Sequence, residues 1–200
     1  MYNCFTARLL PTGRFESTGI ICLDRKYRPG SRHLGLSAGR GRRYDSDMTS
    51  HPAFERIAGT WTGSGFGEYP TIDDFEYQEE TEFRDVGKPF LAYSQRTWSP
   101  DGTPMHVETG YLRLVGDWAE FTIAQPTGQT ELLEGHIDLT DERIVLQLTG
   151  RVLNTSTAKN VEMTKRRFVF AGNDLTVNFS MAAVGCEMTR HLTAQLMRNP

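Results

Sequence analysis

The sequence predicts an all-β protein, a single antiparallel β-barrel of about ten strands that follows a disordered N-terminal extension. Three observations support this prediction. Hydrophobicity after Met48 alternates with a period of two, turn-forming residues interrupt the alternation at short intervals, and no connection is long enough for a crossover helix. A twisted sheet of so many strands usually closes to remove its edges, and a barrel of more than about eight strands has room for a ligand.

The first 47 residues differ from the rest in charge and in pattern. They contain nine Lys or Arg against four Asp or Glu, whereas the whole chain of 200 residues has a net charge of −3. The segment has no sustained periodicity and ends in Gly-Arg-Gly-Arg-Arg, which is too polar to pack. We therefore expect residues 1–47 to be a disordered basic extension, or upstream sequence from a misplaced start, rather than a nucleic-acid-binding arm. Residues 48–200 are expected to form the folded domain.

Strands are predicted where apolar and polar residues alternate. In the run 75–83, Phe, Tyr and Thr side chains share one face, while Glu and Gln side chains share the other. Glu79 falls on the apolar side and is the one misfit of this run. The runs 143–149 and 175–181 alternate in the same manner. Each pattern is typical of a strand with one solvated face.

Turns separate these runs. Hairpin-like connections are predicted at 100–102, 115–117 and 172–174, where Gly stands beside Asp or Asn, and Gly87-Lys88-Pro89 marks a further break. At most a short helical turn is expected, over residues 52–58, before the first strand.

The predicted first strand opens with glycines at alternate positions, Gly-x-Trp-x-Gly-x-Gly from Gly59 to Gly65. A phosphate-binding loop is not indicated, because no helix pattern follows and no Lys-Ser/Thr pair closes the motif. Glycines on one side of a strand instead allow close approach of a second backbone or a flat ligand. Trp61 would plug one end of the barrel, as the Gly-x-Trp motif does in lipocalin-like barrels.

The longer motif, which continues to Tyr69-Pro70-Thr71-Ile72, resembles the nitrobindin family. Further similarities extend over about residues 51–198, including 87–91, 108–113, 157–159, 181–185 and the closing His191-Leu192. The resemblance implies a lipocalin-like barrel that binds ferric haem through one histidine near the C-terminus. That histidine matches His191. Thr71 matches the threonine that contacts the haem in this family, near a propionate, and Lys159 could pair with a propionate.

Without the resemblance, other interpretations of these residues are at least as good. His191 would be an ordinary strand residue. The residues that share its face of the strand are Thr193, Gln195 and Met197, and they do not show that this face points inward. Thr71 could simply close the turn after Pro70, and Lys159 could be a solvated lysine. The other histidines are expected at the surface: His33, His51, His106 and His136. No distal histidine can be assigned.

The resemblance implies a cofactor and an activity. With no Cys-x-x-Cys-His motif, covalent attachment is excluded and the haem would be b-type. The implied function is an enzyme that isomerises peroxynitrite to nitrate and binds nitric oxide. One alternative is a nitric oxide sensor or haem carrier without catalysis. Another is a haem-free, lipocalin-like carrier of an apolar ligand.

Composition limits partners and location. The three cysteines are widely separated, which argues against a disulfide framework and indicates the cytoplasm. No apolar run approaches the length of a membrane span, and the first residues lack a secretory pattern. Neither a nucleic acid nor a membrane is expected as a partner, whereas a homodimer is compatible with the sequence.

Overall fold

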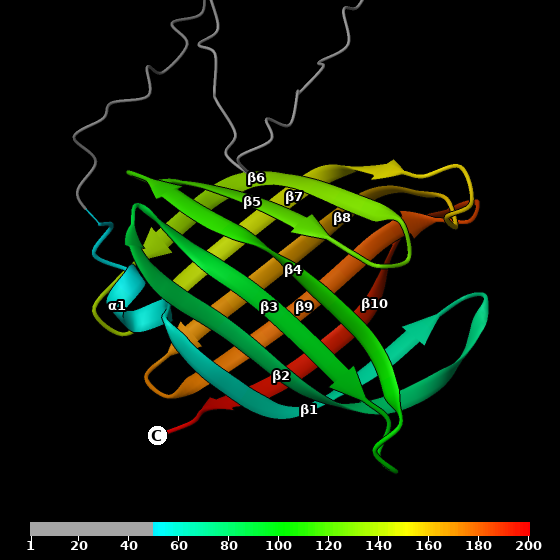
Figure 1. The fold of residues 1–200 in the computed structure, drawn as a ribbon, viewed down its shortest axis with the longest axis horizontal. Helices are drawn as coiled ribbons and strands as arrows, with labels where there is room; N and C mark the ends of the chain where they lie inside the picture. Colours follow the sequence, from blue (N-terminus) through cyan, green and yellow to red (C-terminus); the bar gives the residue numbers. More distant parts are fainter. Residues whose placement is uncertain (1–49) are drawn as a thin grey trace, which may run out of the picture. The chain divides into compact units, whose positions relative to one another are not determined.

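The computed structural model describes residues 50–200, which form one closed antiparallel barrel of ten strands (Figure 1). The prediction of an all-β barrel is therefore confirmed. One short helix precedes the strands, α1 (Phe54–Ile57), where a helical turn was predicted. The strands are β1 (Gly59–Tyr69), β2 (Ile72–Lys88), β3 (Phe90–Trp98), β4 (Pro104–Val115), β5 (Trp118–Ala124), β6 (Gln129–Leu139), β7 (Ile144–Asn154), β8 (Val161–Ala171), β9 (Asp174–Ala183) and β10 (Cys186–Arg198). The predicted extension, 1–47, lies outside the described residues.

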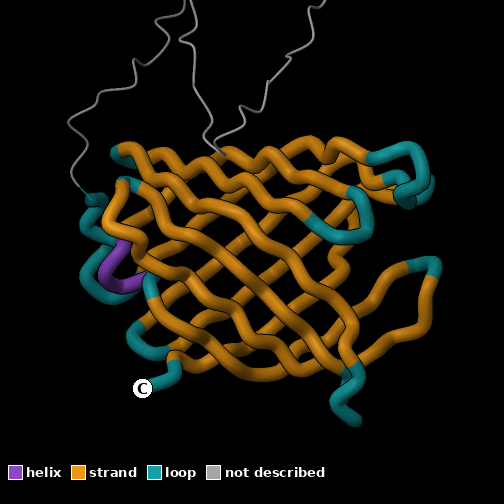
Figure 2. The backbone as a smooth tube through the Cα atoms, viewed as in Figure 1, coloured by secondary structure: helices purple, strands orange, loops and turns teal. Residues whose placement is uncertain are grey.

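Each strand pairs with its neighbours in sequence, and β1 pairs with β10 to close the barrel. Short turns and loops join consecutive strands, as the backbone tube in Figure 2 shows. Gly87, Gly102, Gly116 and Gly172 all adopt positive φ angles in the predicted turns, a conformation that glycine tolerates without strain. The turn predictions are thus confirmed.

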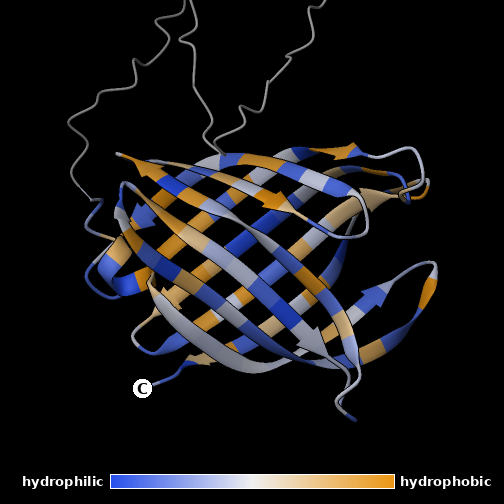
Figure 3. Ribbon diagram, in the orientation of Figure 1, coloured by the Kyte–Doolittle hydropathy of each residue, from blue (hydrophilic) through white to orange (hydrophobic). Residues whose placement is uncertain are grey.

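The alternation of side chains along the strands divides the inside of the barrel from the outside, and it is visible as alternating colours along each ribbon in Figure 3. On β2, Tyr77, Thr81 and Phe83 are buried while Glu76 and Gln78 are exposed. No helix in residues 50–200 is long and apolar enough to span a membrane.

The half of the barrel next to α1, here called the packed half, is filled by aromatic rings. Trp61 is fully buried, donates from Nε1 to the Ile57 carbonyl at 3.1 Å, and packs edge-on against Phe170 with 5.3 Å between ring centroids. The Arg198 guanidinium lies 4.4 Å from the centre of the Trp61 ring. Trp61 plugs this end, as predicted. The other rings that fill the packed half are Phe83, Tyr93, Phe121 and Phe168.

The glycines of β1 make room for neighbouring groups. A Cβ on Gly63 would lie 2.1 Å from the Gln195 carbonyl oxygen of β10, so the two backbones are closer than any side chain allows. A Cβ on Gly65 would lie 2.2 Å from the ring of Tyr77. The glycine motif thus serves close packing within the wall, and it brings aromatic rings to the inner surface.

Candidate functional site

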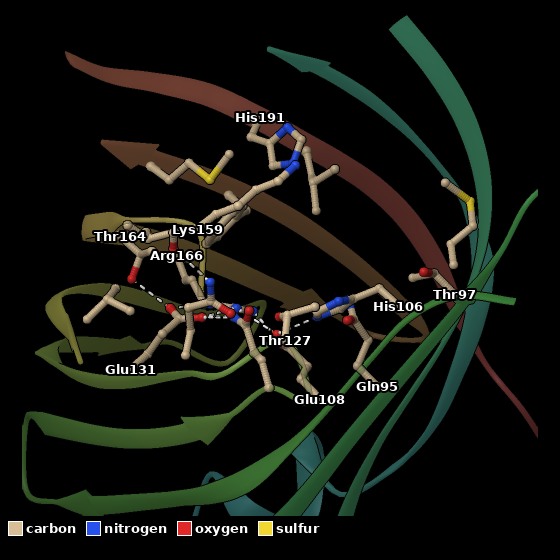
Figure 4. A pocket seen from close by; sticks show the side chains of 18 of the residues that line it. Gln95, Thr97, His106, Glu108, Thr127, Glu131, Lys159, Thr164, Arg166 and His191 are labelled. Carbon is tan, nitrogen blue, oxygen red and sulfur yellow. Dashed lines mark hydrogen bonds and ion pairs between the residues drawn. The ribbon is translucent and has the colours of Figure 1, made fainter. Parts of the chain in front are cut away.

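The half of the barrel away from α1 is hollow. A cavity of about 510 Å³ opens at the hairpin ends that include Thr127, between β5 and β6, and Lys159, between β7 and β8. Its volume is in the range of small-molecule and cofactor sites. His191 from β10 and a set of polar side chains from the other strands line it (Figure 4).

His191 reaches this cavity because β10 contains a bulge. Arg190 pairs with Ser180 of β9 and Leu192 pairs with Phe179, which leaves His191 as an extra residue without a partner in the ladder. In the regular part of β10, Ala194 and Leu196 face inward. His191, at an odd position, would therefore face outward in a regular strand. The bulge turns its ring inward beside Leu192, and both residues line the cavity.

One nitrogen of the His191 ring is held by the backbone of β1. The β1–β10 ladder ends at the pair Gly67 and Leu192, and the next carbonyl, that of Glu68, lies 3.0 Å from His191 Nδ1. A carbonyl only accepts, so Nδ1 carries the proton and donates to it. The lone pair of a neutral ring is then on Nε2, the nitrogen available to a metal.

Aromatic rings surround the imidazole and keep it partly dry. The rings of Tyr69, Phe75 and Phe179 lie with centroids 5.3, 6.2 and 6.0 Å from that of His191. Burial lowers the pKa of His191 below its usual value, opposed by the hydrogen bond to the Glu68 carbonyl. The ring is therefore neutral at physiological pH, the state that binds iron.

The inner wall carries a buried ionic cluster centred on Arg166. Its guanidinium donates to both oxygens of Glu108, at 2.7 and 2.8 Å, and to both oxygens of Glu131, at 2.5 and 3.1 Å. Thr164 donates to Glu131 at 2.6 Å, and the Tyr93 hydroxyl donates to Glu108 at 2.7 Å. Two carboxylates thus share one cation in this cluster.

The cluster sets the charge of Glu108. Burial would raise the pKa of this carboxyl, but the Arg166 guanidinium and a hydrogen bond from His106 outweigh burial and lower it to about 2. His106 contributes through Nε2, which lies 3.4 Å from Glu108 Oε2. Glu108 is consequently an anion at all ordinary pH values.

A single histidine ligand beside a cavity fits a haem better than it fits a bare metal ion. Within residues 50–200 no three His, Cys, Asp or Glu side chains gather as a site for a bare metal ion. A haem brings four nitrogen ligands of its own and needs only one from the protein. His191 Nε2 is a suitable ligand, since its tautomer is fixed and its ring lies on the wall of a cavity large enough to admit a flat ring system.

Comparison with known proteins agrees with this geometry. The model of the THAP4-like, heme-binding beta-barrel domain matches residues 52–198. This chain belongs to that family.

The matches with relatives span most of the length of each relative. A peroxynitrite isomerase of Nocardia farcinica is 44% identical over 155 residues, which are 74% of this chain and 92% of that protein. Peroxynitrite isomerase 1 of Rhodococcus jostii is 45% identical over 150 residues, 74% of this chain and 83% of that protein. The crystal structure of Rv2717c from M. tuberculosis has a TM-score of 0.73 at 40% identity and covers 76% of this chain and 100% of that chain. The predicted family and the haem cofactor are therefore confirmed.

The three residues predicted from the sequence to bind haem lie in different surroundings. His191 and Lys159 both line the cavity, with Lys159 exposed at its mouth. Thr71 is exposed in the turn between β1 and β2 and is not among the lining residues. The cavity thus brings together two of the three.

Sequence reasoning missed the polar side chains of the inner wall. Glu79, Glu108, Glu131 and Arg166 are each at most 6% exposed and line the cavity. Glu79 was recognised as a misfit, and the same signal, a charged residue on an inward-facing position, was available for the others. His106 was expected at the surface, but it lines the cavity and is only partly exposed.

Proposed function

We propose that this chain is a haem-dependent peroxynitrite isomerase in which His191 is the proximal ligand of a b-type haem. The observation that carries this proposal is the hydrogen bond from His191 Nδ1 to the Glu68 carbonyl, which leaves Nε2 free beside the cavity. The activity is that named for the relatives, which are 41–45% identical to this chain. When bound, ferric haem supplies the Lewis acid at which the O–O bond of peroxynitrite is rearranged.

The protein's own part is to hold and orient. His191 donates electron density from one side, and the aromatic rings around it limit the access of water. Lys159 places a cation at the mouth, where it can pair with a haem propionate and attract an anionic substrate. Thr71, in the nearby exposed turn, is proposed to donate its hydroxyl to a propionate.

Nitric oxide is proposed as a second ligand of the same site, since it binds haem iron without needing a charged partner. A nitric oxide sensor or a haem carrier would use the same haem-site residues as the enzyme. We place the protein in the cytoplasm, in keeping with its widely spaced cysteines. The homodimer stays a prediction, and sedimentation equilibrium of the full chain would decide it.

The domain limits are also proposed rather than established. We propose that residues 48–200 are sufficient to bind haem, because the barrel closes within residues 59–198. A chain that begins at Met48 should show the same haem absorbance as the full chain. Lower haem affinity of this shorter chain would give the first 47 residues a role in the site.

The test compares the ferric protein with its His191→Ala variant. After addition of hemin, the wild type should show a Soret band and convert peroxynitrite to nitrate, and the variant should do neither. Far-ultraviolet circular dichroism of the apoproteins should coincide, because the bulge residue takes no part in the ladder. If the wild type binds haem but removes peroxynitrite at the uncatalysed rate, the function reduces to haem or nitric oxide binding, and an equal Soret band in His191→Ala would rule out His191 as the ligand.

A further inference from the structure

Glu68 of β1 is held twice by β10, once through its side chain and once through its backbone. Its carboxylate oxygen Oε1 accepts a hydrogen bond from Arg190 Nε at 2.5 Å and also contacts Nη2 of the same guanidinium. Its carbonyl oxygen lies 3.0 Å from His191 Nδ1. Two successive residues of β10 thus contact one residue of β1, and only the second contact involves the haem ligand directly.

We propose that Arg190 and Glu68 are positioning residues for the haem ligand: their ion pair holds the Glu68 carbonyl at the place where it fixes the His191 ring. This inference rests on the proposed binding of haem through His191. Neither Arg190 nor Glu68 lines the cavity, so the pair acts on the iron only through the imidazole.

The backbone at Glu68 lies where regular strand pairing is interrupted on both sides. The β1–β10 ladder ends at the pair of Gly67 with Leu192, and the β1–β2 ladder shifts its register between Gly67 and Tyr69. Beyond this point the end of the β1–β2 hairpin projects from the barrel wall (Figure 1). The direction of the Glu68 carbonyl therefore depends on contacts made outside the two ladders.

Such contacts hold the peptide group of this carbonyl at both ends. The peptide joins Glu68 to Tyr69, whose side chain is buried. The Tyr69 hydroxyl accepts a hydrogen bond from the Ala183 backbone N–H at 3.1 Å, which ties this end of the peptide to β9. The Glu68 carboxylate ties the other end to Arg190 of β10. Because a peptide group is planar, anchoring both flanking residues restricts the direction of its carbonyl.

Arg190 is a suitable anchor because its own backbone is paired with Ser180 of β9. His191 follows it immediately and has no partner in that ladder. The guanidinium is a rigid, planar group of donors, so two of its nitrogens on one oxygen define the position of Glu68 more narrowly than a lysine would. The paired residue before the bulge thus holds the acceptor for the unpaired residue within it.

A positioning role can be separated from a role in folding. The side chains of Arg190 and Glu68 are 63% and 35% exposed, and exposed ion pairs contribute little to folding stability. Groups that orient a metal-binding histidine, in contrast, commonly change metal affinity 10- to 100-fold when they are removed. Loss of the pair should therefore leave the barrel folded and loosen the His191 ring.

A matched control is available on the neighbouring strands. Arg96 of β3 pairs with Glu80 of β2 at 2.6 Å, and these side chains are 60% and 33% exposed. The pair has the same chemistry and nearly the same exposure as Arg190 and Glu68, but it lies between β2 and β3, away from the β1–β10 ladder. Arg96→Glu should therefore leave His191 unchanged.

The orientation of the ring can be tested without haem. A free neutral histidine carries its proton mainly on Nε2, whereas the Glu68 carbonyl requires it on Nδ1. We expect nitrogen-15 NMR of the apoprotein at pH 8 to show His191 in the Nδ1–H form in the wild type and in Arg96→Glu. Arg190→Glu, which places two carboxylates together, should shift the ring toward the Nε2–H form.

The effect on haem can be measured by transfer of hemin to excess apomyoglobin. We expect Arg190→Glu to release haem about tenfold faster than the wild type or Arg96→Glu. The double variant Arg190→Glu/Glu68→Arg, which reverses the pair, should restore most of the wild-type rate. The iron–histidine stretching frequency of the ferrous protein should fall in Arg190→Glu and recover in the double variant, because a weaker hydrogen bond at Nδ1 makes Nε2 a weaker donor.

Two results would overturn the proposal. One is a tautomer and a haem release rate in Arg190→Glu that equal those of Arg96→Glu. The other is an impaired Arg190→Glu that the reversed pair does not restore, since the ion pair would then not be the cause. Far-ultraviolet circular dichroism checks the fold, and Arg190→Met, which removes the pair without repulsion, replaces Arg190→Glu if the latter does not fold.

These tests fail separately from the proposed function. If His191→Ala keeps the Soret band, His191 is not the haem ligand, while the NMR spectra still show whether the ion pair fixes its ring. If His191→Ala loses the band but Arg190→Glu retains the wild-type tautomer and haem release rate, only the positioning role of Arg190 and Glu68 is lost.

Discussion

The two halves of this barrel are built from the same ten strands, but one interior is filled with aromatic side chains and the other contains a cavity lined by polar groups. In the packed half, aromatic rings meet one another around Trp61, and the Tyr93 hydroxyl, which donates to Glu108, links these rings to the ionic cluster. In the hollow half, the inward positions carry Glu79, Glu108, Glu131 and Arg166 around a cavity. One half contributes burial of apolar surface, and the other offers a site whose charged groups must stabilise one another.

The difference shows how a small barrel can hold a large cofactor. Emptying half of the interior removes apolar contacts, and burying carboxylates there adds a desolvation cost. The packed half offsets both with dense aromatic packing and with the α1 segment over its end. Stability and function are thus located at different ends, and substitutions should separate them.

The largest effect is expected at the packed end. Trp61→Ala should lower the free energy of unfolding by about 3–5 kcal/mol, because it empties a fully buried site and removes the hydrogen bond to Ile57. Urea unfolding of the apoprotein measures this, and folded protein should keep the Soret band of the wild type. Trp118→Ala is the control, since Trp118 is only half-buried and should cost much less. A lost Soret band in folded Trp61→Ala would mean that the two halves are not independent.

A somewhat smaller effect is expected in the ionic cluster. Arg166→Met leaves Glu108 and Glu131 buried without their cation and should destabilise the protein by about 3 kcal/mol at pH 7. Because the unpaired carboxyls then hold protons more tightly in the folded than in the unfolded state, the loss should shrink as the pH falls. Urea unfolding at pH 7 and pH 5 tests both statements. The exposed neighbour Arg167, changed to Met, should show neither effect.

The smallest of the three effects concerns acid. The folded-state pKa of Glu108 is about 2, below its ordinary value of 4.5, so the stabilisation it provides is present above pH 4.5 and is lost as the pH falls toward 2. Between pH 5 and pH 3 this loss should be about 2 kcal/mol in the wild type. It should be absent from Glu108→Gln, although that variant is less stable overall. Parallel pH profiles of the two proteins would show that Glu108 is not held charged by Arg166.

The barrel itself was predictable because a period of two and short turns leave few other arrangements. The run 75–83 and the turn glycines allowed the strands and hairpins to be located, and Trp61 allowed the closed end to be identified. The inward direction of His191 was not predictable from residues alone. In β10 the even positions face inward, and only the bulge, which depends on pairing with β9, reverses this at residue 191.

The polar wall illustrates a second limit. Glu79 could be recognised as out of place, and Thr81, which donates to it, lies on the same strand. The ionic cluster, in contrast, is assembled from strands far apart in sequence. Arg166 and Glu108 are 58 residues apart, and only closure of the barrel brings them together. A charged residue at an inward position indicates a site, whereas the identity of its partner requires the register of every strand between them.

The bulge has a consequence for how such a protein could change over time. Ser180 and Phe179 are adjacent, and their partners Arg190 and Leu192 flank a single surplus residue. Deletion of one codon, that of His191, would remove this irregularity and leave the other pairs of β9 and β10 in place, including the second register shift between Cys186 and Thr189. Loss of the proposed iron ligand would therefore need only one codon deletion, with no compensating change in the rest of the barrel wall.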